Sequence, residues 1–327
     1  MNYIDRLKDN FKAWFEGEAY TDIVLIASAP KPGYEYRWSP WDSWSIVKLF
    51  KRGRDPIEAL DSFEEWILRT VFIGDGFPRF WINLGPGALA AFLGAKPIPM
   101  DDTVWFKGGF DWSYLDTLEA KPRGNYWKLA DRLTVEGCRR GKERFVVGIT
   151  DIGGPTDVAG ILRGVDKLFI DSFRNRTKVK KLLDTVVDAW IEVYDRHSRI
   201  ILSSLGVMSC WMHILYPDIG YPIQCDLSVY MSPKLFEEIG FKPLTRLCER
   251  LEYPVYHLDG PGEIPHLDRI KALPGLKAIQ WTPGAGKPDV DDPCWFHLYD
   301  RILEGGLNLV LLGMKPENIV KIARRFN

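Results

Sequence analysis

Short apolar runs alternate with amphipathic helical patterns along most of this chain, and this alternation limits its fold more than any other feature. The runs are rich in Val, Ile and Trp, and several end at Gly or Pro. Short strands of this kind, connected by helices, are typical of parallel β-α-β units that are buried on both faces. The runs lie at 22–30, 79–87, 145–151, 207–214, 221–231, 253–259, 276–284 and 307–313.

Roughly eight such runs suit a (β/α)8 TIM barrel of α/β class, and a doubly wound open sheet is the alternative. The chain has 327 residues, and no repeat or low-complexity linker divides it, so we predict a single domain spanning 1–327. No G-x-G-x-x-G follows the first run and no P-loop motif occurs. The sequence therefore argues against dinucleotide-binding and P-loop architectures.

Helical patterns fill most segments between the apolar runs. Asp55 is a candidate N-cap with Pro56 after it, and Ser232 with Pro233 repeats this arrangement. A short hairpin strand is expected within 103–109. The expected helices lie at 1–20, 55–72, 88–95, 126–141, 155–164, 177–206, 232–251, 264–273, 293–306 and 315–326.

Charge and composition exclude several classes of protein. The net charge is −1, which provides no basic field for binding nucleic acid. No apolar stretch reaches the roughly 20 residues of a membrane span, and the first residues do not resemble a signal peptide. We therefore expect a cytoplasmic protein without a membrane partner. The five cysteines are scattered and form no C-x-x-C pair, so a disulfide framework is not expected.

Polar side chains collect where the predicted strands end, and in parallel barrels these ends carry the active site. We predict that Asp226, His257 and Asp259 act in catalysis. The predicted substrate-binding residues follow other strands or lie in the aromatic loop at 34–44, where flat side chains suit a pocket wall. They are Asn83, Thr150, Asp151, Tyr230, Trp281, Trp38 and Trp41.

His257 and Asp259 are two positions apart on a predicted strand, so their side chains share one face. Imidazole and carboxylate are both ligands of zinc or iron, and Asp226 or Cys225 could supply a third ligand. Alternatively, a carboxylate-oriented His257 acts as a general acid or base. Structural roles also stay open, namely a buried, hydrogen-bonded structural histidine at His257, an Asp-Gly turn at Asp259, a buried amide contact at Asp226 and a turn at Asp151.

Four segments resemble the uroporphyrinogen decarboxylase superfamily, in particular its divergent branch found with cobamide-dependent methyltransferase systems of the trimethylamine corrinoid protein type. They are GITDIGGPTDVAGILRG (148–164), YPIQCDLSVYMSPKLFEEI (221–239), YPVYHLDGPGEIPHLDRIKALPGLKAIQWTPGAGKP (253–288) and LYDRILEGGLNLVLL (298–312). The resemblance runs from about residue 75 to the last residue. It implies a (β/α)8 barrel with its site at the carboxyl ends of the strands.

The resemblance implies two chemistries. Cofactor-free decarboxylases of the superfamily use an aspartate after the second strand, where this chain has Asn83, and an arginine-rich N-terminal motif that is absent here. Thiol-activating methyltransferases bind zinc through an H-x-C pair and a further cysteine. Here the pair reads His257-Leu258-Asp259, and the last strand ends without a cysteine. A harder site built from Asp226, His257 and Asp259, or no metal, fits this chain better.

The leading hypothesis is a methyltransferase component that moves a methyl group between a small methylated substrate and a corrinoid (cobalamin-type) cofactor on a partner protein. A divalent metal such as zinc is an open prediction. The alternatives are a cofactor-free decarboxylase or lyase, with Arg37, Arg79 or Arg163 holding a substrate carboxylate, and a non-catalytic ligand-binding relative. The oligomeric state is left open, a homodimer included.

Overall fold

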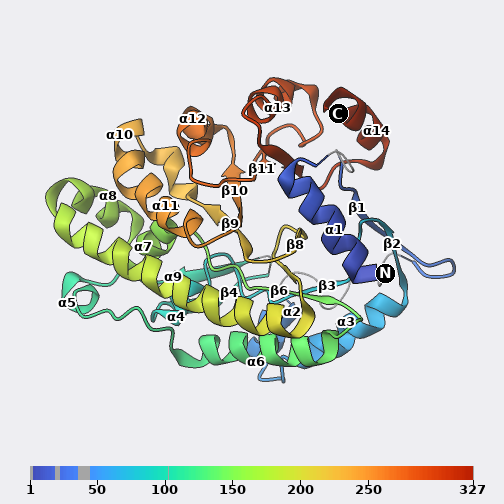
Figure 1. The fold of residues 1–327 in the computed structure, drawn as a ribbon. Helices are drawn as coiled ribbons and strands as arrows, with labels where there is room; N and C mark the ends of the chain where they lie inside the picture. Colours follow the sequence, from blue (N-terminus) through green and yellow to red (C-terminus); the bar gives the residue numbers. More distant parts are fainter. Residues whose placement is uncertain (1–2, 19–22, 36–44, 102, 327) are drawn as a thin grey trace.

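The computed structural model describes residues 3–18, 23–35, 45–101 and 103–326 (Figure 1). Its strands form two four-stranded sheets and two antiparallel pairs. The first sheet has the order β12-β11-β10-β9, and the second has the order β3-β6-β7-β8. The strands of these sheets are β3 Arg79–Trp81, β6 Val146–Gly148, β7 Met208–Ser209, β8 Leu215–Tyr216, β9 Gly220–Gln224, β10 Tyr253–Asp259, β11 Ala278–Thr282 and β12 Asn308–Leu311.

All strands of the first sheet are parallel, and His257 on β10 lies between Gln224 on β9 and Gln280 on β11. In the second sheet β3, β6 and β7 are parallel, whereas β8 returns antiparallel to β7. The predicted α/β class with parallel strands is confirmed. A closed eight-stranded barrel remains a prediction, because the described strands form two separate sheets.

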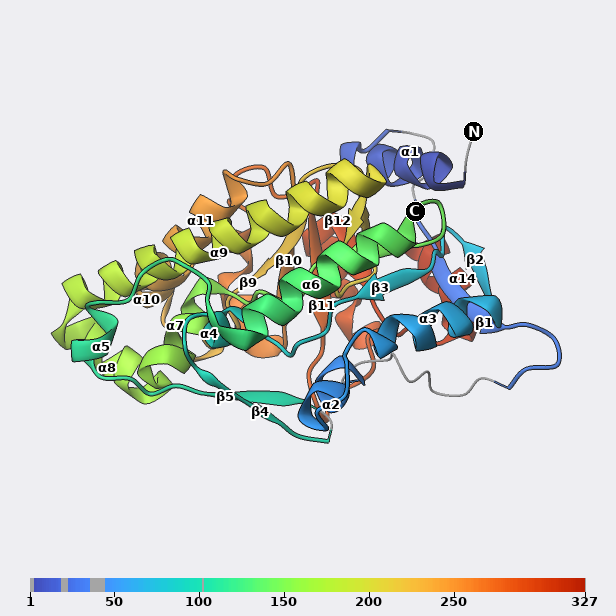
Figure 2. The same cartoon turned by 90° about the horizontal axis from the view of Figure 1, so that it is seen from below.

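Helices follow most of the parallel strands, and the two longest lie side by side, as Figure 2 shows. α9 carries a buried apolar stripe that includes Val186 and Trp190, and it ends at Gly206, whose φ of 71° is favourable for glycine. The helices are α1 Tyr3–Glu16, α2 Ser45–Lys51, α3 Glu58–Leu68, α4 Leu89–Phe92, α5 Trp112–Leu115, α6 Gly124–Gly141, α7 Pro155–Arg163, α8 Val165–Arg174, α9 Arg176–Leu205, α10 Pro233–Leu235, α11 Lys242–Cys248, α12 Leu267–Ile270, α13 Phe296–Leu303 and α14 Pro316–Phe326.

Shorter helical turns follow several strands. The 3₁₀ turns are η1 Asp226–Tyr230, η3 Pro261–His266 and η4 Pro293–Trp295, and η2 Phe236–Phe241 is a π-helical segment. The π-helical segment interrupts the predicted helix 232–251 just before Pro243, which has no N–H for an α-helical hydrogen bond. No described helix is long and apolar enough to cross a membrane.

Two predictions about the N-terminal third were wrong. The predicted helix 55–72 ends at Leu68, and β2 Thr70–Gly74 follows it. β2 pairs antiparallel with β1 Ile26–Pro30, so the first apolar run lies outside both parallel sheets. The segment 70–73 is β-branched or aromatic throughout, and these residues favour an extended chain. The expected hairpin strand is present as β5 Val104–Lys107, paired with β4 Lys96–Pro99.

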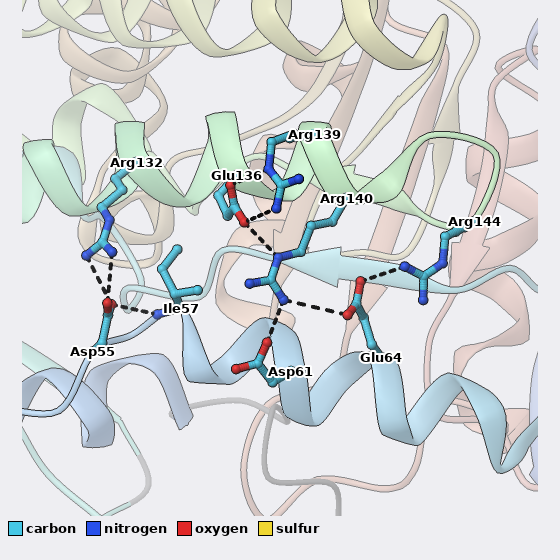
Figure 3. Close-up of polar contacts among 9 residues, drawn as sticks. All are labelled: Asp55, Ile57, Asp61, Glu64, Arg132, Glu136, Arg139, Arg140 and Arg144. Atoms are coloured by element: carbon cyan, nitrogen blue, oxygen red, sulfur yellow. Dashed lines mark hydrogen bonds and ion pairs between the residues drawn. The ribbon is translucent and has the colours of Figure 1, made fainter.

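An ion-pair network fastens α3 to α6 (Figure 3). Arg140 on α6 contacts Asp61 at 2.5 Å and Glu136 at 2.7 Å, and its side chain is only 19% exposed. Arg132 reaches Asp55 at 2.8 Å, before the start of α3. The network fixes the outer layer over β3 and β6 without entering the strand ends where we expect the site.

Candidate functional site

The three predicted catalytic side chains lie together. One ligand atom from each of Asp226, His257 and Asp259 lies within 4.8 Å of the others. His257 and Asp259 share one face of β10 because they are two positions apart. Asp226 opens η1 directly after β9, the strand beside β10. Two neighbouring parallel strands therefore deliver these residues, called the acidic trio below, to one point.

The neighbours of Gln280 determine which nitrogen of His257 carries the proton. The Gln280 side-chain N–H groups donate to the Trp281 carbonyl at 2.7 Å and to Thr282 Oγ1 at 2.9 Å. Its Oε1 therefore accepts a hydrogen bond from Nδ1 of His257. With the proton on Nδ1, the neutral ring keeps its Nε2 lone pair for a metal, a proton or a substrate. The ring is 8% exposed and lies edge-on to Trp211, with centroids 4.9 Å apart.

Buried carboxyl groups surround the acidic trio. Burial and the charge of Asp226 raise the pKa of Asp151 to about 7, and they raise that of Glu263 to about 10. The same two causes raise the pKa of Asp157 well above its ordinary value, although its carboxylate accepts N–H bonds from Asp226 and Leu227. Burial also raises the pKa of Asp226 itself. Each carboxyl group that ionises in this region therefore makes ionisation of the others less favourable.

No Lys or Arg in the described part of the chain forms an ion pair with Asp151, Asp157, Asp226 or Glu263. Asp226 Oδ1 is buried and has no hydrogen-bond partner among the described residues, while its Oδ2 accepts from Gln224 at 3.1 Å. Buried carboxylates without a basic partner are costly. A cation or a proton donor bound at the trio would remove this cost.

The trio fits a divalent metal. One imidazole nitrogen and two carboxylate oxygens suit zinc, iron or manganese, and three protein ligands leave a position open for a substrate. Ligand atoms around zinc lie roughly 3.4 Å apart at bond lengths of about 2.1 Å, so rotations of the two half-buried carboxylates would bring the three ligand atoms to this spacing. Cys225 lies elsewhere, because its sulfur faces Gly240 on η2 and burial keeps its thiol protonated by raising its pKa. Asp226 rather than Cys225 would therefore be the third donor to such a metal.

The predicted substrate-binding residues fall into two groups. Asn83, Thr150 and Asp151 are buried beyond the carboxyl ends of β3 and β6. Asp151 accepts the N–H of Gly153 at 2.9 Å, so it does form the turn that the sequence suggested. Thr150 Oγ1 and Asn83 Nδ2 are buried without partners in the described residues.

The aromatic predictions are placed differently. Trp281 alternates with Gln280 and Thr282 along β11 and packs on Trp295, so the structure does not bring it to the acidic trio. Tyr230 is 73% exposed at the end of η1, edge-on to Phe169. Trp38 and Trp41 lie outside the described residues.

Three residues beside the trio were not among the predicted site residues. Gln224 and Gln280 flank His257 in the sheet register, and Trp211 contacts its ring. The alternation that paired His257 with Asp259 selects Gln280 and Thr282 on the next strand, so the sequence contained this signal. Trp211 follows a strand of only two residues, and nothing in the sequence indicates its direction.

No protein-family model and no curated protein matches this sequence. Among solved structures, a methyltransferase from Methanosarcina mazei resembles the chain with a TM-score of 0.55 and 14% sequence identity. The match covers 98% of this chain and 97% of that chain. At this identity the likeness shows a shared fold over the whole length.

Proposed function

We propose that this protein is a methyltransferase that moves a methyl group between a small methylated substrate and a corrinoid cofactor on a partner protein. The carrying observation is the convergence of Asp226, His257 and Asp259, with Nε2 of His257 left available by Gln280. The full-length likeness to a methyltransferase supports the same class of reaction.

Demethylation needs assistance at the heteroatom. When the carbon–heteroatom bond breaks, the heteroatom keeps the electron pair, and a bare alkoxide or amide is a poor leaving group. A protonated His257 donates through Nε2, because Nδ1 is committed to Gln280, and Asp226 and Asp259 stabilise its positive charge. A zinc ion held by the same three residues would supply Lewis-acid stabilisation.

The decarboxylase alternative has less support. It needs a cationic side chain for the substrate carboxylate. Arg163 forms an ion pair with Asp171 at 2.7 Å, and Arg79 donates to the carbonyls of Cys210 and Trp211. Arg37 lies outside the described residues. No contact in the described residues favours this reaction over methyl transfer.

Methyl transfer can be followed directly. Purified protein is mixed with methylcobalamin and a panel of thiol, amine and alcohol acceptors, and the loss of alkyl-cobalt absorbance is recorded. We expect turnover with one acceptor class and at least about 100-fold slower turnover for His257→Ala. His297→Ala removes an exposed histidine of α13 and should leave the rate unchanged. Absence of turnover with every acceptor would contradict the proposal.

Metal analysis tests the second part of the proposal. We expect about one equivalent of zinc or another divalent metal per chain, with affinity reduced at least tenfold by Asp226→Asn. Asp166→Asn changes an exposed aspartate of α8 in the same way and should leave the metal content unchanged. If the protein is fully active without metal, the metal is not part of the mechanism and His257 alone acts as the acid.

A further inference from the structure

Three polar side chains that follow strands of the second sheet have buried atoms without hydrogen-bond partners in the described residues. The atoms are Asn83 Nδ2, Thr150 Oγ1 and Trp211 Nε1. Trp81, Gly148 and Ser209 are register partners across β3, β6 and β7, and each of the three residues lies two positions beyond one of them. Asn83, Thr150 and Trp211, called the donor row below, therefore follow three neighbouring strands, each two residues after these register partners.

The donor row adjoins the acidic trio. The indole of Trp211 lies edge-on to the imidazole of His257 at an interplanar angle of 87°, with ring centroids 4.9 Å apart. A small molecule that contacts His257 would therefore also lie close to Trp211, the member of the donor row nearest to the trio.

The donor row offers hydrogen-bond donors to a ligand. An indole N–H can only donate, and the Asn83 amide presents its N–H groups because its Oδ1 already accepts from the N–H of Gly85 at 3.1 Å. The Thr150 hydroxyl can donate as well. Arg79 adds positive charge behind the row, where it donates to the Trp211 carbonyl at 2.7 Å. Asp151 also lies beside Thr150, and its raised pKa of about 7 favours the protonated, neutral form of its carboxyl group below that pH. In that form the row and Arg79 together are complementary to an anionic acceptor.

Resting on the proposed function, we infer that the donor row binds a carboxylate of the substrate, whose methylated heteroatom then faces His257. The substrate class is thus a small methylated acid. Buried donors are rarely left unpaired in native proteins, because each costs about 1–3 kcal/mol when it is not satisfied. A carboxylate offers enough acceptor positions for all three donors, and each charge-assisted hydrogen bond is stronger than a neutral one.

Binding can be measured without methyl transfer. Methoxyacetate, methylthioacetate and N,N-dimethylglycine are titrated into the full-length protein by calorimetry, each beside the alcohol in which a hydroxymethyl group replaces the carboxylate. We expect at least one acid to bind about tenfold or more tightly than its alcohol. Equal affinities, or no measurable binding of any acid, would show that ordered water satisfies these donors and would overturn the inference.

Thr150→Val separates a ligand contact from a structural one. It removes a hydroxyl that has no partner in the described residues, so the affinity for the preferred acid should fall about tenfold while the melting temperature of the free protein is unchanged or higher. The matched control is Thr134→Val on α6, whose buried hydroxyl donates to the Ala130 carbonyl at 2.8 Å. The control should lower the melting temperature and leave the affinity unchanged. Unchanged affinity in Thr150→Val would contradict the inference.

The two proposals fail separately. Preferential binding of an acid that depends on Thr150, without any methyl transfer, would retain the carboxylate site and reject the reaction. Methyl transfer with a substrate that has no carboxylate, together with equal binding of each acid and its alcohol, would retain the reaction and reject the carboxylate site.

Discussion

Replacing Asp151 by asparagine should stabilise the protein, and the gain should grow as the pH rises. Asp151 is buried, and the pKa of its carboxyl group is raised from 3.8 to about 7 by burial and by the charge of Asp226. Asparagine has nearly the same shape and keeps an oxygen that can accept from the N–H of Gly153. The substitution therefore removes the titrating charge and preserves the turn.

The magnitude follows from the pKa difference between the folded and unfolded states. Because the pKa of Asp151 is higher in the folded state, the folded state binds more protons than the unfolded state. The contribution of Asp151 to the free energy of unfolding is therefore fully present below pH 3.8 and is lost as the pH rises toward 7. At about 1.4 kcal/mol for each pKa unit, the loss above pH 7 is about 4 kcal/mol. About 2.5 kcal/mol of that loss occurs between pH 5 and pH 8.

Urea unfolding of both proteins at pH 5 and pH 8 measures this difference directly. The free energy of unfolding of Asp151→Asn should exceed that of the wild type by more at pH 8 than at pH 5, and the increase should approach the value above. Groups that do not interact with Asp151 titrate alike in both proteins and cancel in the comparison. The charge of Asp151 also raises the pKa of Asp157, so its removal adds to the gain in the same direction. A difference that is independent of pH, or that shrinks toward pH 8, would refute a raised pKa at Asp151.

Three further predictions concern the supports of the site. Gln280→Leu should lower kcat by about 10–100-fold with little change in KM in steady-state kinetics, because Nδ1 of His257 loses its acceptor. Arg140→Met should destabilise the protein by about 1–3 kcal/mol in urea unfolding, whereas Arg139→Met, at an arginine that is 67% exposed, should change stability by less than about 0.5 kcal/mol. Gly154→Ala should lower the melting temperature by several degrees, since its Cβ would lie 2.2 Å from the backbone oxygen at the end of β9.

Much of the first sheet could be predicted from the sequence, because a buried parallel strand has a nearly continuous run of apolar residues. The strands at 220–224, 253–259, 278–282 and 308–311 all lie within or beside the predicted runs. The strand period also predicted that His257 and Asp259 share one face. These features depend on local pattern alone.

The errors occurred where a longer-range partner decides the structure. Residues 70–74 continue an apolar pattern that suits a helix, but antiparallel pairing with 26–30 makes them a strand. The direction of a side chain just after a strand depends on the turn that follows, which hydropathy does not encode. Tyr230 therefore lies 73% exposed on η1, although it is only four residues after Asp226.

The buried carboxyl groups destabilise the folded protein, and this loss of stability indicates a functional role for them. Asp151, Asp157, Asp226 and Glu263 have raised pKa values, and each would be cheaper to bury as an amide. Such costs persist where a site needs them, since active sites are where burial and like charges shift pKa values. If a divalent cation occupies the acidic trio, its charge should lower the pKa of Asp151. The gain of Asp151→Asn at pH 8 should then shrink when zinc is added, and an undiminished gain with zinc would place the cation elsewhere.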